Sequence, residues 1–370
     1  MTSYTIAQDN SETLQIDDGD TVLVDTGVLI VDPSVELNTR TGLTDWAGIQ
    51  DTDGGDNRLA VFGTVEGFVG TWLWEGSDTV SVGAGGEIYG FNAGAEFHDG
   101  GHDLLDVKAG GEVASTLYAV WFGAFPHYDY TTLPLSGFDT VDNAGLIEGV
   151  DREGIRMVFG GNHVVNSGTV MSHLGPAIML DSGVDDPRNF VTNTGRLDGG
   201  SLGSAIVSGD APMTVSNDGS IVGDVQFGAG DDRFTGSGTI AGTLYGGAGN
   251  DHLVGGAGAT SFCGGAGADY LQAGSGVNTF IYNAPSDSTE GSGVDTIDGF
   301  DFAKDHIVIA GVTLASFDHI DALSQLQPGH AALIESAGGV WHLVVDANGI
   351  SGYQAGADYM ITLTHPLHLS

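Results

Sequence analysis

Two nine-residue segments share a glycine-rich pattern that strongly restricts the possible fold. Residues 246–254 read GGAGNDHLV and residues 264–272 read GGAGADYLQ, so both match G-G-x-G-x-D-x-U-x, where U is a large apolar residue. Residues 227–235, FGAGDDRFT, differ only at the first glycine. The glycines allow a tight turn with positive φ and inward-facing carbonyl groups, the aspartate adds a carboxylate, and the apolar residue begins a short core strand. Tandem copies of this pattern bind calcium in parallel β-rolls, so the sequence predicts a chain that needs Ca²⁺ to fold.

The spacing of the repeats predicts which aspartates share a calcium ion. If two nonapeptides complete one turn of about 18 residues, each ion lies between repeats stacked on the same side. The repeats start at residues 227, 246 and 264, which places Asp232, Asp251 and Asp269 in one row. The opposite row consists of Ala241, Thr260 and Asn278. We therefore expect two calcium sites, Asp232/Asp251 and Asp251/Asp269, and a weak or empty opposite row.

The predicted calcium ligands are these aspartates and the glycine turns that precede them. The full set is Asp232, Asp251, Asp269, Gly228, Gly230, Gly247, Gly249, Gly265, Gly267 and, in the opposite row, Asn278. The alternative is that the aspartates only cap turns. The complete glycine context favours calcium.

The repeats resemble the RTX (repeats-in-toxin) family of secreted bacterial proteins. The resemblance continues beyond them, because residues 287–289 (DST), 295–300 (DTIDGF) and 305–307 (DHI) are similar to the C-terminal module of serralysin-type RTX proteins. It covers roughly residues 227–370. The resemblance implies export by a type I secretion system through an uncleaved C-terminal signal, and residues 359–370, free of Asp, Glu, Lys and Arg, resemble one. We therefore expect an extracellular or cell-surface protein.

The composition is strongly acidic. The chain has 49 Asp and Glu residues against 9 Lys and Arg residues, a formal charge of −40, so it repels itself until cations neutralise it, and nucleic acid is excluded as a natural partner. With 62 glycines and 41% hydrophobic residues, it suits a turn-rich β protein with a real core. Cys263 is the only cysteine, so calcium takes the place of an internal disulfide.

We expect neither a cleaved secretion signal nor a transmembrane segment. Residues 1–6 lack the basic and apolar regions of a signal peptide. No run of about 18 apolar residues occurs in the sequence.

A second periodicity lies upstream of the glycine-rich repeats. Three copies of strand, Asn-x-Gly turn and strand read VDNAGLIEG at 141–149, VTNTGRLDG at 191–199 and VSNDGSIVG at 215–223, and 164–172 is a weaker copy. Such a unit is typical of one rung of a parallel β-helix. Several rungs open on an acid or amide, namely Asp78, Asp103, Asp139 and Asn189. Because these residues lack the G-G-x-G context, we expect them to form turns rather than bind metal.

The predicted fold is therefore all-β. We expect a parallel β-helix or β-solenoid in residues 1–226, continuing into a calcium-binding RTX β-roll in 227–281, and a C-terminal β cap with the secretion signal in 282–370.

Aromatic residues gather where the spacing between Asp103 and Asp139 is lengthened. The segment 115–137 contains Tyr118, Trp121, Phe122, Phe125, His127, Tyr128 and Tyr130, and an earlier rung contains Phe68, Trp72 and Trp74. An aromatic loop of this kind is suited to stack on sugar rings or to drive self-association. The alternative is that these side chains bury themselves as a lid on the flank of the helix.

Three short segments partly match catalytic motifs. Residues 98–102, HDGGH, lack the glutamate of a zinc peptidase, and their glycines would break the required helix. Residues 199–203, GGSLG, match a nucleophile elbow without the flanking strand and helix. Residues 127–130, HYDY, offer acid and base groups for a uronate epimerase or lyase, but Lys108 is the only lysine before residue 300 and the acidic surface disfavours polyanions.

The sequence predicts a secreted calcium-binding solenoid with a structural or adhesive role at the cell surface or in the extracellular matrix, and it favours a role without enzymatic activity. The expected partners are calcium and a polysaccharide or cell-surface component, together with self-assembly. The alternative is a secreted polysaccharide-modifying enzyme that carries an RTX module.

Overall fold

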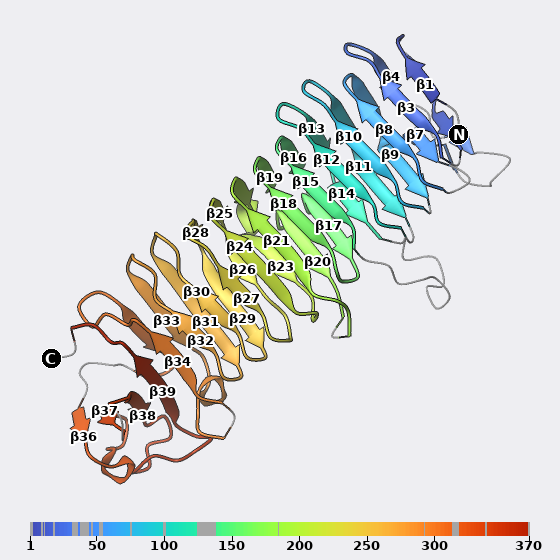
Figure 1. Ribbon diagram of the computed structural model, residues 1–370. Helices are drawn as coiled ribbons and strands as arrows, with labels where there is room; N and C mark the ends of the chain where they lie inside the picture. The colour runs from blue at the N-terminus through green and yellow to red at the C-terminus, as the bar shows by residue number, and fades with distance from the viewer. Residues whose placement is uncertain are drawn as a thin grey trace. The chain divides into compact units, whose positions relative to one another are not determined.

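The structure is a computed structural model that divides into two compact units (Figure 1). It describes all residues except 1–2, 9, 11, 18, 32–35, 38–43, 46, 52–54, 75, 99–100, 124–137, 184, 292, 313–317, 337–338 and 369–370. Unit 1 comprises Met1–Ala211 and Gly219–Gly223, and unit 2 comprises Pro212–Asp218 and Asp224–Ser370. Within the described residues the elements are strands and three 3₁₀ helices.

Unit 1 is a solenoid with three faces of parallel strands. The first face contains β1 (Ser3–Ile6), β3 (Thr21–Val24), β8 (Arg58–Val61), β10 (Thr79–Val82), β12 (Leu104–Val107), β15 (Thr140–Asn143), β18 (His163–Asn166) and β21 (Asn189–Asn193). The second contains β4 (Leu29–Val31), the first halves of β9 (Thr64–Trp74) and β11 (Glu87–His98), β13 (Glu112–Ser115), β16 (Leu146–Gly149), β19 (Thr169–Ser172), β22 (Arg196–Asp198) and β25 (Ser220–Val222). The third contains β2 (Leu14–Ile16), β7 (Ala47–Asp51), the second halves of β9 and β11, β14 (Tyr118–Phe122), β17 (Ile155–Val158), β20 (Ile178–Asp181) and β23 (Ser204–Ser208). The short strands β5 (Glu36–Leu37) and β6 (Thr44–Asp45) form an antiparallel pair, and the 3₁₀ helix η2 spans Gly200–Leu202.

The core of unit 1 consists of aliphatic side chains stacked in register, one from each rung. On the first face the buried stack is Val22, Leu59, Val80, Leu105, Val141, Val164 and Val191. Side chains alternate between buried and more exposed positions along these strands, as the two-residue period of a strand requires.

Asparagine side chains explain the repeated Asn-x-Gly turns. The Asn143 Nδ2 donates a hydrogen bond to the Asn166 Oδ1 (2.8 Å), and the Asn166 Nδ2 donates to the Asn193 Oδ1 (2.7 Å). All three asparagines are buried. The amide ladder therefore fixes the stacking of successive turns, because each buried polar group finds its partner in the next rung.

Unit 2 begins as a roll with two faces of parallel strands. One face contains β24 (Met213–Asn217), β27 (Arg233–Thr235), β30 (His252–Val254), β32 (Tyr270–Gln272) and β34 (Asp295–Asp298). The other contains β26 (Asp224–Gln226), β29 (Thr243–Ala248), β31 (Thr260–Ala266), β33 (Asn278–Tyr282) and β35 (His306–Ile309). The strand β28 (Thr239–Ala241) and the 3₁₀ helix η3 (Pro285–Asp287) complete this region.

A cap of mixed strands follows the roll, coloured orange to dark red in Figure 1. It contains β36 (Asp318–Ile320), η4 (Leu323–Gln325), β37 (Ala331–Glu335), β38 (Trp341–Val345) and β39 (Tyr359–Thr364). The strand β39 pairs antiparallel with β38 and parallel with β34, so the final strand extends one face of the roll. Leu343, Val344 and Leu363 are buried there.

The expected all-β solenoid is confirmed. The placement of the aromatic residues differs from the expectation: Tyr118, Trp121 and Phe122 lie on strand β14 rather than on an inserted loop, because this apolar run pairs with both β11 and β17. Trp72, Tyr118 and Trp121 are each only 8% exposed. The expected aromatic residues Phe125, His127, Tyr128 and Tyr130 lie outside the described residues. No helix in the described part is long and apolar enough to cross a membrane.

Candidate calcium-binding row

Four aspartates are stacked along one edge of unit 2. Asp232, Asp251, Asp269 and Asp295 each lie at the start of a strand on the same face of the roll, and we call them the aspartate row. The backbone N–H of Asp232 donates to the Asp251 Oδ1 (2.8 Å), that of Asp251 to the Asp269 Oδ1 (2.9 Å), and that of Asp269 to the Asp295 Oδ1 (2.9 Å). Each carboxylate therefore closes the turn of the preceding repeat and is held in a fixed position.

The second carboxylate oxygen of the two central aspartates is buried without a hydrogen bond. Asp251 and Asp269 are each 2% exposed, and within the described part of the chain neither Oδ2 has a hydrogen-bond partner. A methyl group on Gly246 would lie 2.3 Å from the Asp251 Oδ2, and one on Gly264 would lie 2.2 Å from the Asp269 Oδ2. The first glycine of the motif is therefore needed to make room for the carboxylate. A buried acidic oxygen without a donor favours a cation or a proton as its partner.

The other glycines of the motif bring backbone carbonyl groups of successive repeats close together. Gly247, Gly249, Gly265 and Gly267 have φ between +98° and +143°, a conformation that favours glycine. A methyl group on Gly247 would lie 2.0 Å from the Gly228 oxygen, and one on Gly249 would lie 2.0 Å from the Gly230 oxygen. The same relationship recurs between Gly265 and the Gly247 oxygen, at 2.1 Å. The predicted glycines thus stack in the expected register.

Burial raises the pKa values of three aspartates of the row, and repulsion from neighbouring charges adds to the increase. Burial raises the pKa of Asp251 to about 8, and the charges of Asp269 and Asp232 add to the increase. Burial likewise raises the pKa of Asp269 to about 6, and burial together with the Asp269 charge raises that of Asp295 to about 9. The row therefore holds a proton readily at neutral pH unless a cation compensates its charge.

The donor atoms of this edge are suited to calcium. Ca²⁺ takes six to eight oxygen ligands from carboxylate and carbonyl groups in a flexible geometry. Among the described residues no three His, Cys, Asp or Glu side chains converge to hold a metal ion. Aspartates of adjacent repeats would thus supply the charged ligands, and backbone carbonyl groups of the glycine turns would complete the shell.

Asp295 is not among the calcium ligands predicted from the sequence. Residues 290–298, EGSGVDTID, follow the nonapeptide pattern except at its first position, as 227–235 do. The repeat starts 26 residues after the one at 264 because an insertion containing η3 intervenes, so a search at 18-residue spacing passes over it. The recurrence of Gly291, Gly293, Asp295 and Ile297 is the signal that would have found it. Asp269 is therefore an internal member of the row and not its end.

The opposite edge of the roll is built differently. The Asn278 Nδ2 donates to the carbonyl oxygens of Gly274 and Gly276 (3.1 Å each), and its Oδ1 accepts from the Gly274 N–H (3.2 Å). Thr260 is buried in the same row. The Asn278 amide thus braces its own turn, and calcium binding by Asn278 stays a prediction.

In unit 1 the contact from a backbone N–H to the side-chain oxygen of the next rung recurs in turns that lack the full G-G-x-G-x-D-x-U-x motif. The backbone N–H of Asp78 donates to the Asp103 Oδ1 (2.7 Å), and that of Asp103 to the Asp139 Oδ1 (3.1 Å). The series continues with Asp139 to Asn162 and Asn162 to Asn189. These acids and amides therefore cap turns, the role expected from their sequence context.

His98 and Ser201, from two of the catalytic patterns, are engaged in other contacts, and the third pattern, 127–130, lies outside the described residues. His98 ends strand β11, and its Nε2 lies 2.7 Å from the Glu96 Oε1 in a pair that is almost completely buried. Ser201 lies in η2, and its Oγ donates to the His173 carbonyl oxygen (3.0 Å). A strand follows Ser201, so the strand–turn–helix context of a nucleophile elbow is not present at this site.

Residues 216–365 match the family model described as Peptidase M10 serralysin C terminal. This segment is similar to the RTX-repeat module of serralysin-type proteins, and it contains the whole aspartate row. Such modules bind Ca²⁺ and are typical of extracellular proteins exported by type I secretion. No curated protein matches the chain.

Proposed function

We propose that the protein is a secreted calcium-binding solenoid that acts as a structural or adhesive component of the cell surface or extracellular matrix. Its module folds on binding Ca²⁺ after type I secretion. The observation that supports this most directly is the aspartate row, in which Asp251 and Asp269 each hold a buried oxygen that has no hydrogen-bond partner in the described part of the chain.

The charge of the chain supports folding outside the cell. At a formal charge of −40, the calcium-free chain repels itself, and bound cations remove both this repulsion and the cost of burying the row. Extracellular calcium modules have dissociation constants of roughly 10⁻⁴ to 10⁻³ M. At the much lower calcium concentration of a cytosol, the module would remain unfolded and able to pass through an exporter.

Unit 1 supports a structural rather than a catalytic role. Its aliphatic stacks and amide ladder repeat the same contact from rung to rung, which builds a rigid support. Tyr118 is 8% exposed and is covered by the guanidinium groups of Arg152 and Arg156, whose Cζ atoms lie 5.4 and 5.9 Å from the ring centroid. Little of this ring is open for stacking on a sugar.

The test combines a retention assay with an activity assay. Cells that secrete the full chain are washed with buffer containing either Ca²⁺ or EDTA, and the released protein is quantified. We expect EDTA, but not Ca²⁺, to release the protein and to remove most of the β-sheet circular dichroism that unit 2 contributes. Purified protein incubated with alginate or pectin and Ca²⁺ should give no absorbance at about 235 nm from unsaturated sugar ends and no epimerised units by NMR. Sugar products would favour the polysaccharide-modifying alternative, and release without EDTA would contradict calcium-dependent retention.

A further inference from the structure

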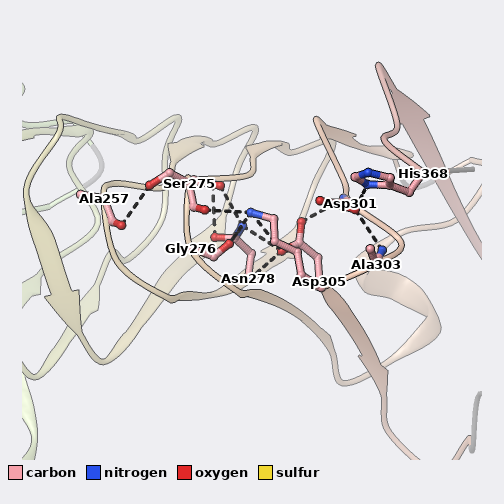
Figure 2. Close-up of polar contacts among 10 residues, drawn as sticks. Ala257, Ser275, Gly276, Asn278, Asp301, Ala303, Asp305 and His368 are labelled. Atoms are coloured by element: carbon pink, nitrogen blue, oxygen red, sulfur yellow. Dashed lines mark hydrogen bonds and ion pairs between the residues drawn. The ribbon is translucent and has the colours of Figure 1, made fainter.

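The edge opposite the aspartate row also ends in a buried carboxylate (Figure 2). Asp305 follows Asn278 in this row, and the backbone N–H of Asn278 donates to the Asp305 Oδ1 (2.8 Å). This contact is the counterpart of that between Asp251 and Asp269 (2.9 Å). The Asp305 side chain has no exposed surface. Its Oδ1 also accepts from the Asn278 Nδ2 (3.1 Å) and its Oδ2 from the backbone N–H of Asp301 (3.0 Å), but these neutral donors do not cancel its negative charge.

A lysine already supplies a positive charge at this carboxylate. The Lys304 Nζ donates to the carbonyl oxygens of Ser275 (2.9 Å) and Gly276 (2.5 Å), and it lies 4.0 Å from the Asp305 Oδ1. Figure 2 shows Asp305 beside Ser275 and Gly276 of the neighbouring turn of the roll. Two backbone carbonyl oxygens and one carboxylate are the ligand types that calcium prefers. The chain has only two lysines, Lys108 and Lys304, so placement of one of them here is a specific feature.

We infer that Lys304 is the built-in cation of the opposite edge. Its ammonium group compensates Asp305, excludes calcium from the turns at 273–278 and 300–305, and ties the two turns together without a metal ion. The edge with the aspartate row thus requires calcium. At the end of the opposite edge, the Lys304 side chain takes the place of an ion. The comparison of the edges rests on the proposed calcium binding of the aspartate row, but the role of Lys304 at Asp305 is tested independently of it.

The contacts of Lys304 differ from those of an ordinary surface ion pair. An exposed pair holds two flexible side chains in water and contributes little to stability. Lys108 forms such a pair, with its Nζ 2.6 Å from the Asp106 Oδ2 and a side chain that is 57% exposed. Lys304 instead contacts two backbone oxygens and a carboxylate with no exposed surface. Lys108→Met is therefore the matched control.

The experiment counts bound calcium by equilibrium dialysis of the full chain at about 20 mM Ca²⁺, well above the dissociation constants of extracellular modules. We expect Lys304→Met to bind one more Ca²⁺ than the wild type, because the vacated oxygens accept an ion. Lys304→Arg and Lys108→Met should bind the wild-type number. The double variant Lys304→Met/Asp305→Asn should also return to the wild-type number.

The outcomes separate this inference from the proposed function. If the wild type binds calcium and Lys304→Met binds the same number, the inference is overturned while calcium binding by the aspartate row is retained. If the wild type binds none and Lys304→Met binds one, the inference is retained and the calcium claim for the row fails. Folding of each variant is followed by circular dichroism as calcium is raised. A Lys304→Met chain that stays unfolded at every calcium concentration, while Lys304→Arg folds, also overturns the inference, because an open cation site should be rescued by calcium.

Discussion

The backbone N–H of Asp251 donates to the Oδ1 of Asp269 across 2.9 Å, while the Oδ2 of Asp269 lies buried over Gly264. One oxygen of the carboxylate is thus used to stack the repeats, and the other remains available for a cation. The same division recurs at Asp251, whose Oδ1 accepts from Asp232 and whose Oδ2 lies over Gly246. Folding and ion binding therefore depend on the same side chains.

Removal of calcium should unfold unit 2. Without a cation the buried carboxylates must either stay charged and repel one another or take up protons, and proton uptake relieves this repulsion only in part at neutral pH in a chain with a formal charge of −40. We expect EDTA to abolish most of the β-sheet circular dichroism of this unit and millimolar Ca²⁺ to restore it. Hydrogen exchange resolved by peptide gives the measurement. Full protection of residues 227–298 in EDTA would contradict the prediction.

Substitutions along the aspartate row should rank by the number of neighbours that each residue serves. Asp251 and Asp269 both lie between two other members of the row, so Asp251→Ala and Asp269→Ala should each destabilise the calcium-loaded fold by about 2 kcal/mol, the scale of a lost hydrogen bond to a charged group. Thr260→Ala, in the opposite row, should have a much smaller effect. Urea unfolding at saturating calcium measures the differences. Equal losses at Asp251 and Thr260 would show that the stacking register does not determine calcium binding.

Acid should partly replace calcium. Burial raises the pKa of Asp251 to about 8 and that of Asp295 to about 9, from the ordinary value of 3.8. Between pH 3.8 and these raised values the folded chain therefore binds more protons than the unfolded chain. Stability of the calcium-free fold must then fall as pH rises through this window. In EDTA we expect a higher melting temperature near pH 5 than near pH 8.5. Calcium affinity should increase as pH rises, because the carboxylates must lose their protons to bind the ion. A calcium-free melting temperature that rises with pH over this range would refute the assignment.

The first glycine of each repeat should be required for the position of the carboxylate. Gly246→Ala places a methyl group 2.3 Å from the Asp251 Oδ2, so the carboxylate must move. We expect at least a tenfold loss of calcium affinity, equivalent to about 1.4 kcal/mol. The control is Gly183→Ala, whose methyl group would meet only the Asp186 Oδ2 at 3.8 Å. Calcium titrations of the two variants should separate them clearly, and equal affinities would argue against a ligand role for Asp251.

The features predicted from sequence are those that recur at fixed spacing. The Asn-x-Gly rungs and the register of Asp232, Asp251 and Asp269 follow from repetition, because a solenoid places equivalent residues one above another. Asp295 was missed because an insertion interrupts the spacing. Lys304 has no local pattern at all, since its carbonyl partners lie 28 and 29 residues earlier and are brought near only by the fold.

The strand β14 on the third face of unit 1 was also not predicted from the sequence. The lengthened spacing between Asp103 and Asp139 predicts an inserted loop at 115–137. Tyr118–Phe122 within this segment form a strand instead, because they pair with β11 and β17. Pairing partners, rather than composition, determine the structure of such a segment.

The last prediction concerns export. The segment 359–370 is expected to act as the secretion signal, and in the folded protein its strand β39 pairs with β34 and β38. Deletion of residues 321–370 should therefore have two effects: the chain stays in the cytoplasm, and the edge of β34 that pairs with Leu363 is left open to aggregation. The two effects are separated by Leu343→Ala, which removes a buried side chain of the cap but lies outside 359–370 and leaves the signal unchanged. This variant should reach the medium through a type I exporter and be less stable there than the wild type. If the truncated chain also reaches the medium through that exporter, the signal lies elsewhere in the sequence.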